Sequence, residues 1–383
     1  MNNYSCIYFD IDENSNINKF NKKNTNNVTN KKQTLKQKIV DFDYFIENEI
    51  YISDKIKKII NYNKYFYIID SHELINYMDM NEFNLIKNDA SELNDFDYEY
   101  DHKTNLKYKK ITSNKILIKY IFLENYVNLN NFLFSDFILD KRFLFYEIIN
   151  IYKKILKSIN ILNENNLFYN HLNSTNIIVN LNNFLPLLSD FKFCINVNDV
   201  INIDNEKSIL ISNLKKIIFH YDPSYYYWPI ELHLISFIFY NNLTSVSSSN
   251  IIEIIEDLTN ENNNPILKNF SNNIKEKYYN DGLNYLKLFI NKSMNDIIKI
   301  IFLYFKTWDN YCLNIMYLEI IINIYKLLNN KNNNFIVNFM KLLLKNISFD
   351  PSLRFSIKLT HNELNKLLNN SNYSEYNEII NVL

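Results

Sequence analysis

The clearest hydrophobic pattern in the chain runs over residues 145–162 and has the period of an α-helix. Apolar side chains recur there at steps of three and four residues, so they share one face of the predicted helix. They are Phe145, Ile148, Ile149, Tyr152, Ile155, Leu156, Ile159 and Leu162. A second helical pattern covers residues 43–60, and its predicted buried side consists of Phe45, Ile46, Ile50, Ile52 and Ile56.

Shorter segments predict strands in the first third of the chain. Residues 115–123 are rich in β-branched and aromatic side chains, which favour extended structure. Weaker strand patterns cover residues 4–10, 34–40 and 65–69. Two polar stretches lack a periodic apolar face and predict loops, namely an Asn- and Lys-rich tract near residues 16–33 and an acidic stretch at 88–102.

Composition and charge narrow the class of protein. Hydrophobic residues make up 47% of the 383-residue chain, enough for one large core or for two domains. The 41 basic and 42 acidic residues give a formal charge of −1, which argues against nucleic acid or an anionic membrane as a partner. Asn, Ile and Lys are abundant whereas glycine occurs once, and we interpret this bias as the codon usage of an AT-rich genome.

Cysteine usage and hydropathy predict an intracellular protein. The three cysteines, Cys6, Cys194 and Cys312, form no C-x-x-C pair, which argues against a zinc site or a disulfide framework. The N-terminus lacks a basic region followed by an apolar core, and no apolar run reaches the ~18 residues that span a membrane. We therefore expect a soluble protein of the cytoplasm.

Candidate chemistry concentrates in residues 165–194, where a polar loop between two apolar segments precedes an Asp-Phe pair. The loop reads YNHLNSTN over residues 169–176, and the pair is Asp190-Phe191, followed by Lys192. This order resembles the catalytic loop, H-R-D-L-x-x-x-N, and the D-F-G metal-binding loop of eukaryotic-type protein kinases.

The resemblance implies roles for three residues of this stretch, with ATP and Mg²⁺ as the cofactors. Asn176 and Asp190 take the positions of the two metal ligands, and their oxygens suit a hard cation. His171 stands where kinases have the aspartate that accepts the substrate hydroxyl proton. An imidazole with an ordinary pKa near ~6.5 can accept a proton, but it cannot supply the negative charge of that aspartate.

Three further residues resemble the framework of the kinase C-lobe. Asp309 takes the place of the aspartate that, in that family, hydrogen-bonds back to the backbone of the catalytic loop. Glu231 matches the glutamate at the end of the activation segment, and Arg354, in a D-P-x-x-R motif, matches its arginine partner. A planar guanidinium suits a buried carboxylate, and the chain has only one other arginine, Arg142.

The resemblance covers about residues 115–368 and implies an α+β, bilobal fold. A small β-rich N-lobe would span residues 1–127, and a larger, mainly helical C-lobe would span residues 128–383 with a helical insert at about 235–305. Glu124 and Tyr126 resemble hinge residues that contact the nucleotide. The insert is similar to that of kinase-like proteins of large DNA viruses, which would place the protein in the host cytoplasm.

The phosphate-binding parts of a kinase N-lobe lack clear counterparts. Gly282, the only glycine, lies in the insert, so the chain has no glycine-rich loop over the triphosphate. Lys38, with Lys36 behind it, is the candidate for the lysine that contacts the phosphates, and Glu49 is its candidate ion-pair partner. In a chain this rich in lysine, both lysines also suit ordinary surface positions.

Three functions stay open on these grounds. The chain lacks the aspartate base and the glycine-rich phosphate loop of kinases. This favours a pseudokinase that acts through protein interaction and still has candidate residues for nucleotide and Mg²⁺. The alternative is an active, divergent serine/threonine protein kinase in which His171 serves as the base. A third interpretation is an unrelated, largely helical interaction protein whose motif matches are accidental.

Overall fold

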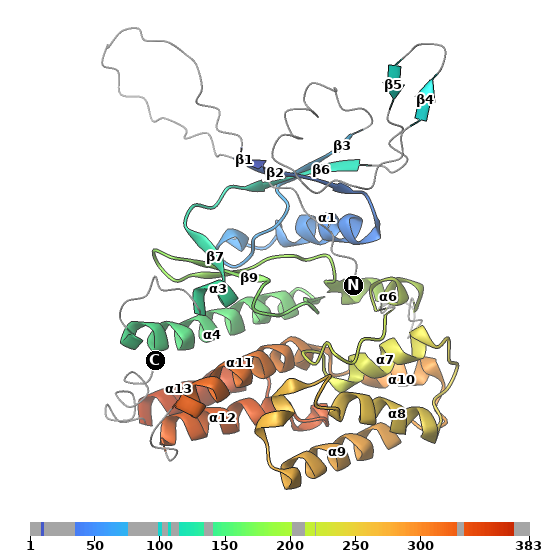
Figure 1. Cartoon of the computed structure of the whole chain (residues 1–383), viewed down its shortest axis with the longest axis vertical. Coiled ribbons are helices and arrows are strands. Elements are labelled where there is room, and N and C mark those ends of the chain that lie inside the picture. The colour runs from blue at the N-terminus through green and yellow to red at the C-terminus, as the bar shows by residue number, and fades with distance from the viewer. Residues whose placement is uncertain are drawn as a thin grey trace. The chain divides into compact units, whose positions relative to one another are not determined.

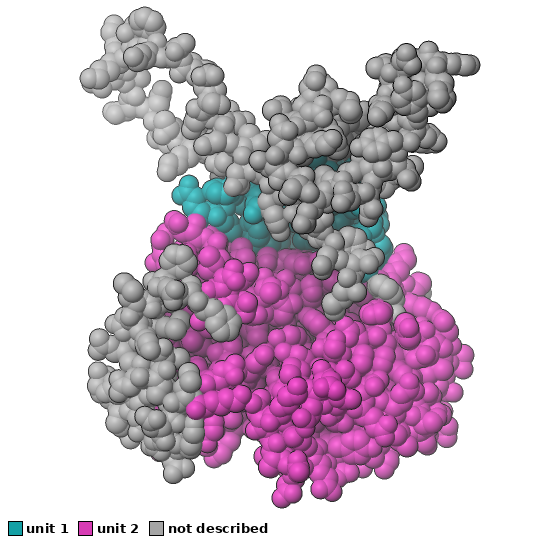
Figure 2. All heavy atoms as spheres, in the orientation of Figure 1, with its two compact units in different colours: residues 1–60, 67–124 teal, residues 61–66, 125–383 magenta. Residues whose placement is uncertain are grey.

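The computed structural model describes residues 9–10, 35–75, 99–101, 106–108, 115–133, 141–200, 211–218, 220–327 and 333–370. The predicted Asn/Lys loop and most of the acidic stretch lie outside these residues. Contacts divide the chain into two compact units, which are coloured separately in Figure 2. Unit 1 consists of residues 1–60 and 67–124, and unit 2 of residues 61–66 and 125–383. The fold is α+β, as expected from the sequence.

Unit 1 is built on a four-stranded antiparallel sheet with the order β1-β2-β6-β3. These strands are β1 (Phe9–Asp10), β2 (Leu35–Asp41), β3 (Ser71–Ile75) and β6 (Lys115–Ile121), and a separate hairpin pairs β4 (Glu99–Asp101) with β5 (Leu106–Tyr108). Helix α1 (Tyr44–Ile56) begins after Asp43, whose side chain caps the first turn by accepting a hydrogen bond from the Ile46 amide. The core joins sheet and helix, because Ile46 and Ile50 pack against buried Ile116 and Ile118.

The strand predicted at residues 65–69 is wrong. The chain forms a short 3₁₀ turn at Tyr62–Lys64 and makes one isolated bridge at Phe66, and β3 follows only at Ser71. The apolar side chains of Ile68 and Ile69 are buried without a ladder, whereas the more polar β3 lies at the edge of its sheet. An edge strand tolerates polar residues, so its sequence gives a weak strand signal.

Unit 2 contains two small antiparallel sheets that hold the polar loop. Strands β10 (Pro186–Leu188), β9 (Ile177–Asn180) and β7 (Tyr126–Asn128) form one sheet in that order. Strand β8 (Leu167–Phe168) pairs with β11 (Ile195–Asn196) in the other. Residues 169–176 therefore connect β8 to β9, and the Asp-Phe pair lies between β10 and β11.

The remainder of unit 2 is helical (Figure 1). Its helices are α3 (Leu129–Leu133), α4 (Lys141–Glu164), α5 (Val197–Val200), α6 (Ile211–Ile217), α7 (Ile230–Tyr240), α8 (Ser248–Thr259), α9 (Asn272–Lys287), α10 (Met294–Phe302), α11 (Trp308–Leu327), α12 (Asn334–Asn346) and α13 (Ile357–Asn370). Shorter 3₁₀ turns lie at Pro265–Asn269, Phe305–Thr307 and Pro351–Leu353. The predicted helix at 145–162 is confirmed within α4, and all eight of its apolar side chains are buried.

Helix α11 packs against α4 at the centre of unit 2. The Tyr152 hydroxyl donates to Asn314 Oδ1 over 2.9 Å, and the Tyr317 hydroxyl donates to the Ile148 carbonyl over 3.0 Å. Both tyrosines are fully buried, so these hydrogen bonds satisfy polar atoms inside an apolar core. Near the end of α4, Asn163 Nδ2 donates to the Lys306 carbonyl over 3.1 Å, just before α11 begins. This contact fixes the start of α11 relative to the end of α4, and the polar loop begins just after α4.

The segment expected as a helical insert forms helices α8, α9 and α10. Gly282 lies on α9 where α8 approaches closely, and a Cβ atom there would lie 2.4 Å from Ile255 Cδ1 and 2.9 Å from Phe349 Cε2. The single glycine of the chain therefore serves helix packing. Among the described residues, no helix combines the length and the apolar character that a membrane span requires.

Candidate functional site

Asp309, the second residue of α11, anchors the loop of residues 169–176. Its Oδ2 accepts a hydrogen bond of 2.9 Å from the Tyr169 amide, and its Oδ1 accepts one of 3.0 Å from the Asn170 amide. Asp309 is fully buried, and burial raises the pKa of its carboxyl to about 7, against the opposing effect of the two amides. The resemblance to kinases implied this contact between Asp309 and the loop backbone.

The loop also bends sharply at Asn170. This residue has φ of 61°, in the left-handed region that asparagine adopts more readily than most residues. Trp228 Nε1 donates to the Asn170 carbonyl over 3.0 Å, so the segment before α7 contacts the same bend. This contact was not predicted from the sequence, because an isolated tryptophan gives no signal of the carbonyl that its N–H reaches.

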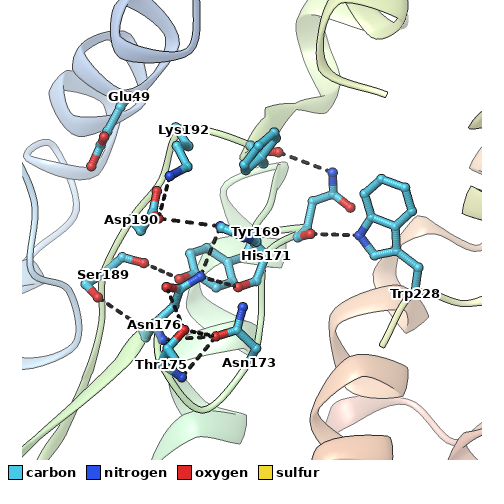
Figure 3. A network of polar contacts seen from close by, with 12 residues as sticks. Glu49, Tyr169, His171, Asn173, Thr175, Asn176, Ser189, Asp190, Lys192 and Trp228 are labelled. Atoms are coloured by element: carbon cyan, nitrogen blue, oxygen red, sulfur yellow. Dashed lines mark hydrogen bonds and ion pairs between the residues drawn. The ribbon is translucent and has the colours of Figure 1, made fainter. Parts of the chain in front are cut away.

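The Asp-Phe pair is joined to the loop by the hydrogen bonds of Ser189, which Figure 3 shows, and by ring packing of Phe191. Ser189 donates from its amide and its hydroxyl to the Asn176 carbonyl, over 2.9 and 3.0 Å. Phe191 is fully buried and packs edge-on against Tyr169 at 5.0 Å, whereas Asp190 has φ of 60° and a side chain that is 27% exposed. The pair therefore directs its phenylalanine into the core and its aspartate toward His171 and Lys192.

Asn173 fixes the turn that leads to Asn176. Its Oδ1 accepts from the Thr175 amide at 3.0 Å, from the Thr175 hydroxyl at 2.6 Å and from the Asn176 amide at 3.2 Å. This is the local side-chain-to-backbone bonding that asparagine offers in turns, and an asparagine within a polar loop is the signal that could have indicated it.

The hydrogen bonds of Asn176 assign the proton on His171. An atom 3.0 Å from the His171 carbonyl oxygen must be a donor, so the amide nitrogen of Asn176 faces His171. The same nitrogen lies 3.0 Å from His171 Nδ1, which therefore accepts. Because a neutral imidazole has one acceptor and one N–H, Nε2 carries the hydrogen.

His171 is consequently a poor proton acceptor. Burial lowers the pKa of its imidazole to about 4, partly opposed by the charge of Asp190. The ring is neutral at pH 7, with Nδ1 engaged by Asn176 and Nε2 already protonated. A general base needs a nitrogen that is open to the substrate proton, and this arrangement offers none.

Asp190 has a cation of the chain itself as its partner. Lys192 Nζ lies 3.0 Å from Asp190 Oδ2, and His171 Nδ1 lies 3.7 Å from the same oxygen. The other oxygen, Asp190 Oδ1, is buried and accepts no hydrogen bond from the described residues. The ammonium group of Lys192 therefore lies where the kinase resemblance implied a metal ion.

The residues as arranged do not fit Mg²⁺. The ion prefers near-octahedral oxygen ligands, whereas here the side-chain nitrogen of Asn176 faces His171. A divalent cation and the Lys192 ammonium on one carboxylate would repel each other by about 8 kcal/mol at ~4 Å and an effective dielectric of ~20, less where water screens them. The described residues contain no cluster of three or more His, Cys, Asp or Glu side chains suited to a metal.

Glu231, in the first turn of α7, forms a buried ion pair with Arg354. Arg354 binds Glu231 through two parallel hydrogen bonds of 2.8 Å, and neither side chain is exposed. Arg354 Nε donates to the Ser348 carbonyl over 2.7 Å, and Trp308 Nε1 donates to Glu231 Oε1 over 3.2 Å. The structure thus brings together the two residues that the sequence paired.

Unit 1 contains three of the residues that the kinase resemblance implied for nucleotide binding, Lys36, Lys38 and Glu49. Lys38 and Lys36 lie half-buried on β2, opposite Ile118 and Tyr120 of β6. Glu49 is buried on α1, and its Oε1 accepts a hydrogen bond of 3.4 Å from the Tyr120 hydroxyl. The ion pair between Lys38 and Glu49 stays a prediction.

The two hinge candidates flank the division between the units. Glu124 is exposed in the turn after β6, and Tyr126 begins β7, where it pairs with Asn180. Their contact with a nucleotide also stays a prediction.

Comparisons with known proteins add no family to this description. No protein-family model matches the chain, and no curated protein matches it.

Proposed function

We propose that the chain is a kinase-like domain of the pseudokinase class, which acts through protein interaction and does not transfer phosphate efficiently. The observation that carries the proposal is the geometry around Asp309. Its carboxylate holds the loop backbone at Tyr169 and Asn170, and the loop then brings His171 to the edge of Asp190. These contacts agree with the framework that the kinase resemblance implies, and the residue at the position of the base is a neutral imidazole.

The charges and hydrogen bonds of the loop favour a domain that has lost phosphoryl transfer over one that still performs it. Phosphoryl transfer depends on positioning and on neutralising phosphate charge with metal ions, together with a residue that receives the hydroxyl proton. Asp190 is paired with Lys192, and the Nδ1 atom of His171 is engaged by Asn176. The chain also lacks a glycine-rich loop, since its only glycine is Gly282 on α9.

A transfer assay tests the proposal. Full-length protein is incubated with γ-labelled ATP, Mg²⁺ or Mn²⁺, and generic serine/threonine substrates, with Asp190→Asn as the matched variant. We expect no incorporation above that of Asp190→Asn, whether into substrate or into the chain itself. Incorporation that depends on Asp190 would overturn the proposal and establish an active serine/threonine kinase.

The interaction function needs its own evidence. Copies of the protein with a photo-crosslinking amino acid on exposed positions of α8 and α9, such as Ile252 and Ile274, can be compared with a copy labelled at buried Ile255. Crosslinks to defined proteins that form only from the exposed positions would support the interaction role. Their absence in the cells where the protein is made would argue against it.

A further inference from the structure

The Asp190 carboxylate contacts one cation of the chain and lies near one imidazole nitrogen. Oδ2 contacts the ammonium of Lys192 at 3.0 Å and lies 3.7 Å from Nδ1 of His171. Asn176 Nδ2 donates to that same Nδ1, so this ring nitrogen has no hydrogen to offer the carboxylate. Lys192 is therefore the group that balances the charge of Asp190.

The ion pair is built into the local chain. Asp190 and Lys192 are separated by Phe191, which is fully buried and held by edge-on contacts with Tyr169 at 5.0 Å and Phe66 at 5.9 Å. The Lys192 ammonium also lies 5.7 Å from the centre of the Phe193 ring. Because the buried phenylalanine fixes the backbone between the two charges, the pair forms without any rearrangement of the fold.

We infer that Lys192 is a built-in counter-ion that takes the place of a divalent cation at Asp190, so that the site excludes Mg²⁺. This inference rests on the proposed function, because it concerns the same loop. A lysine ammonium is a compact charge, and here it neutralises the carboxylate that would have to bind the metal ion.

Binding of Mn²⁺ to the full chain, measured by electron paramagnetic resonance of the free ion, tests the exclusion of metal. Wild type should bind no more tightly than Asp190→Asn. Lys192→Met should bind at least about tenfold more tightly, because the competing charge is gone, and Lys192→Met combined with Asp190→Asn should lose that gain. Tighter binding by wild type than by Asp190→Asn, or no gain in Lys192→Met, would overturn the inference.

Correct folding of the variants is established by thermal melting and circular dichroism. Lys192→Gln provides a second neutral side chain, and it should show the same gain if Lys192→Met unfolds. A gain in one folded neutral variant and not in the other would contradict a charge effect and overturn the inference.

Failure of the proposed function is distinguishable, since it shows as phosphate transfer in the labelled-ATP assay, whatever the Mn²⁺ result.

Discussion

Replacement of Arg354 by methionine should destabilise unit 2 strongly, because it leaves the Glu231 carboxylate charged and buried without its cation. Arg354 and Glu231 share two hydrogen bonds of 2.8 Å, and neither side chain is exposed. Removing one partner of a buried ion pair costs about 3–5 kcal/mol. After the change the Trp308 indole, at 3.2 Å, is the one remaining donor to Glu231 among the residues that the structure describes.

Two further variants separate charge from geometry. Arg354→Lys keeps a cation but loses the planar fork and the 2.7 Å bond from Nε to Ser348, so we expect a loss of about 2 kcal/mol. Arg354→Met combined with Glu231→Gln removes the unpaired charge and should recover about 1–3 kcal/mol relative to Arg354→Met alone. The double-variant cycle therefore measures the coupling between the two residues.

Urea unfolding followed by tryptophan fluorescence is the assay, because both tryptophans of the chain, Trp228 and Trp308, lie in unit 2. Lys366→Met is the control, because it breaks a surface ion pair with Glu363. The side chain of Lys366 is 67% exposed and that of Glu363 is 33% exposed, so the change should alter stability by less than ~1 kcal/mol. A loss in Arg354→Met as small as in this control would refute the assignment of a buried, coupled pair.

Two other predictions concern packing and protonation in unit 2. Gly282→Ala should destabilise by about 1–2 kcal/mol, because its Cβ would lie 2.4 Å from Ile255 Cδ1 and 2.9 Å from Phe349 Cε2. Asn284→Ala, at an exposed position of the same helix, should leave the urea midpoint unchanged or raise it, and equal effects at both positions would contradict the packing argument. Asp309→Asn should cost about 1–3 kcal/mol at neutral pH, since an amide has one oxygen for the two N–H groups of Tyr169 and Asn170. The pKa of Asp309 is raised from 3.8 to about 7, so its protonated form stabilises the fold below pH 3.8 and that contribution is lost as the pH rises through about 7. The advantage of wild type over Asp309→Asn should therefore narrow across this range, and an advantage that widens would contradict the raised pKa.

Much of the helical part could be predicted, because a helix that buries one face needs apolar residues at steps of three and four along its sequence. Along α4 the apolar steps of three and four residues match a continuous buried face from Phe145 to Leu162. Strand β3 could not be found in this way, since an edge strand needs no apolar alternation. The buried residues just before it, Ile68 and Ile69, produced the false strand signal.

The framework of the candidate site was more predictable than its protonation. Asp309, Glu231 and Arg354 lie in short motifs, and each is buried against the partner that the kinase resemblance implied. The state of His171 depends on which atom of Asn176 faces it, which only the folded loop determines. The position of the Lys192 ammonium depends in the same way on a side-chain rotamer.

The central claim is that the loop retains a kinase-like framework around an imidazole that cannot serve as a base. Nitrogen-15 NMR of the histidine side chains tests it most directly, because a negative transfer assay also results from a wrong substrate. With the signal assigned by its loss in His171→Gln, we predict a neutral ring protonated on Nε2 and a titration midpoint near a pKa of about 4. A ring protonated on Nδ1, or a midpoint at or above 6.5, would contradict the account.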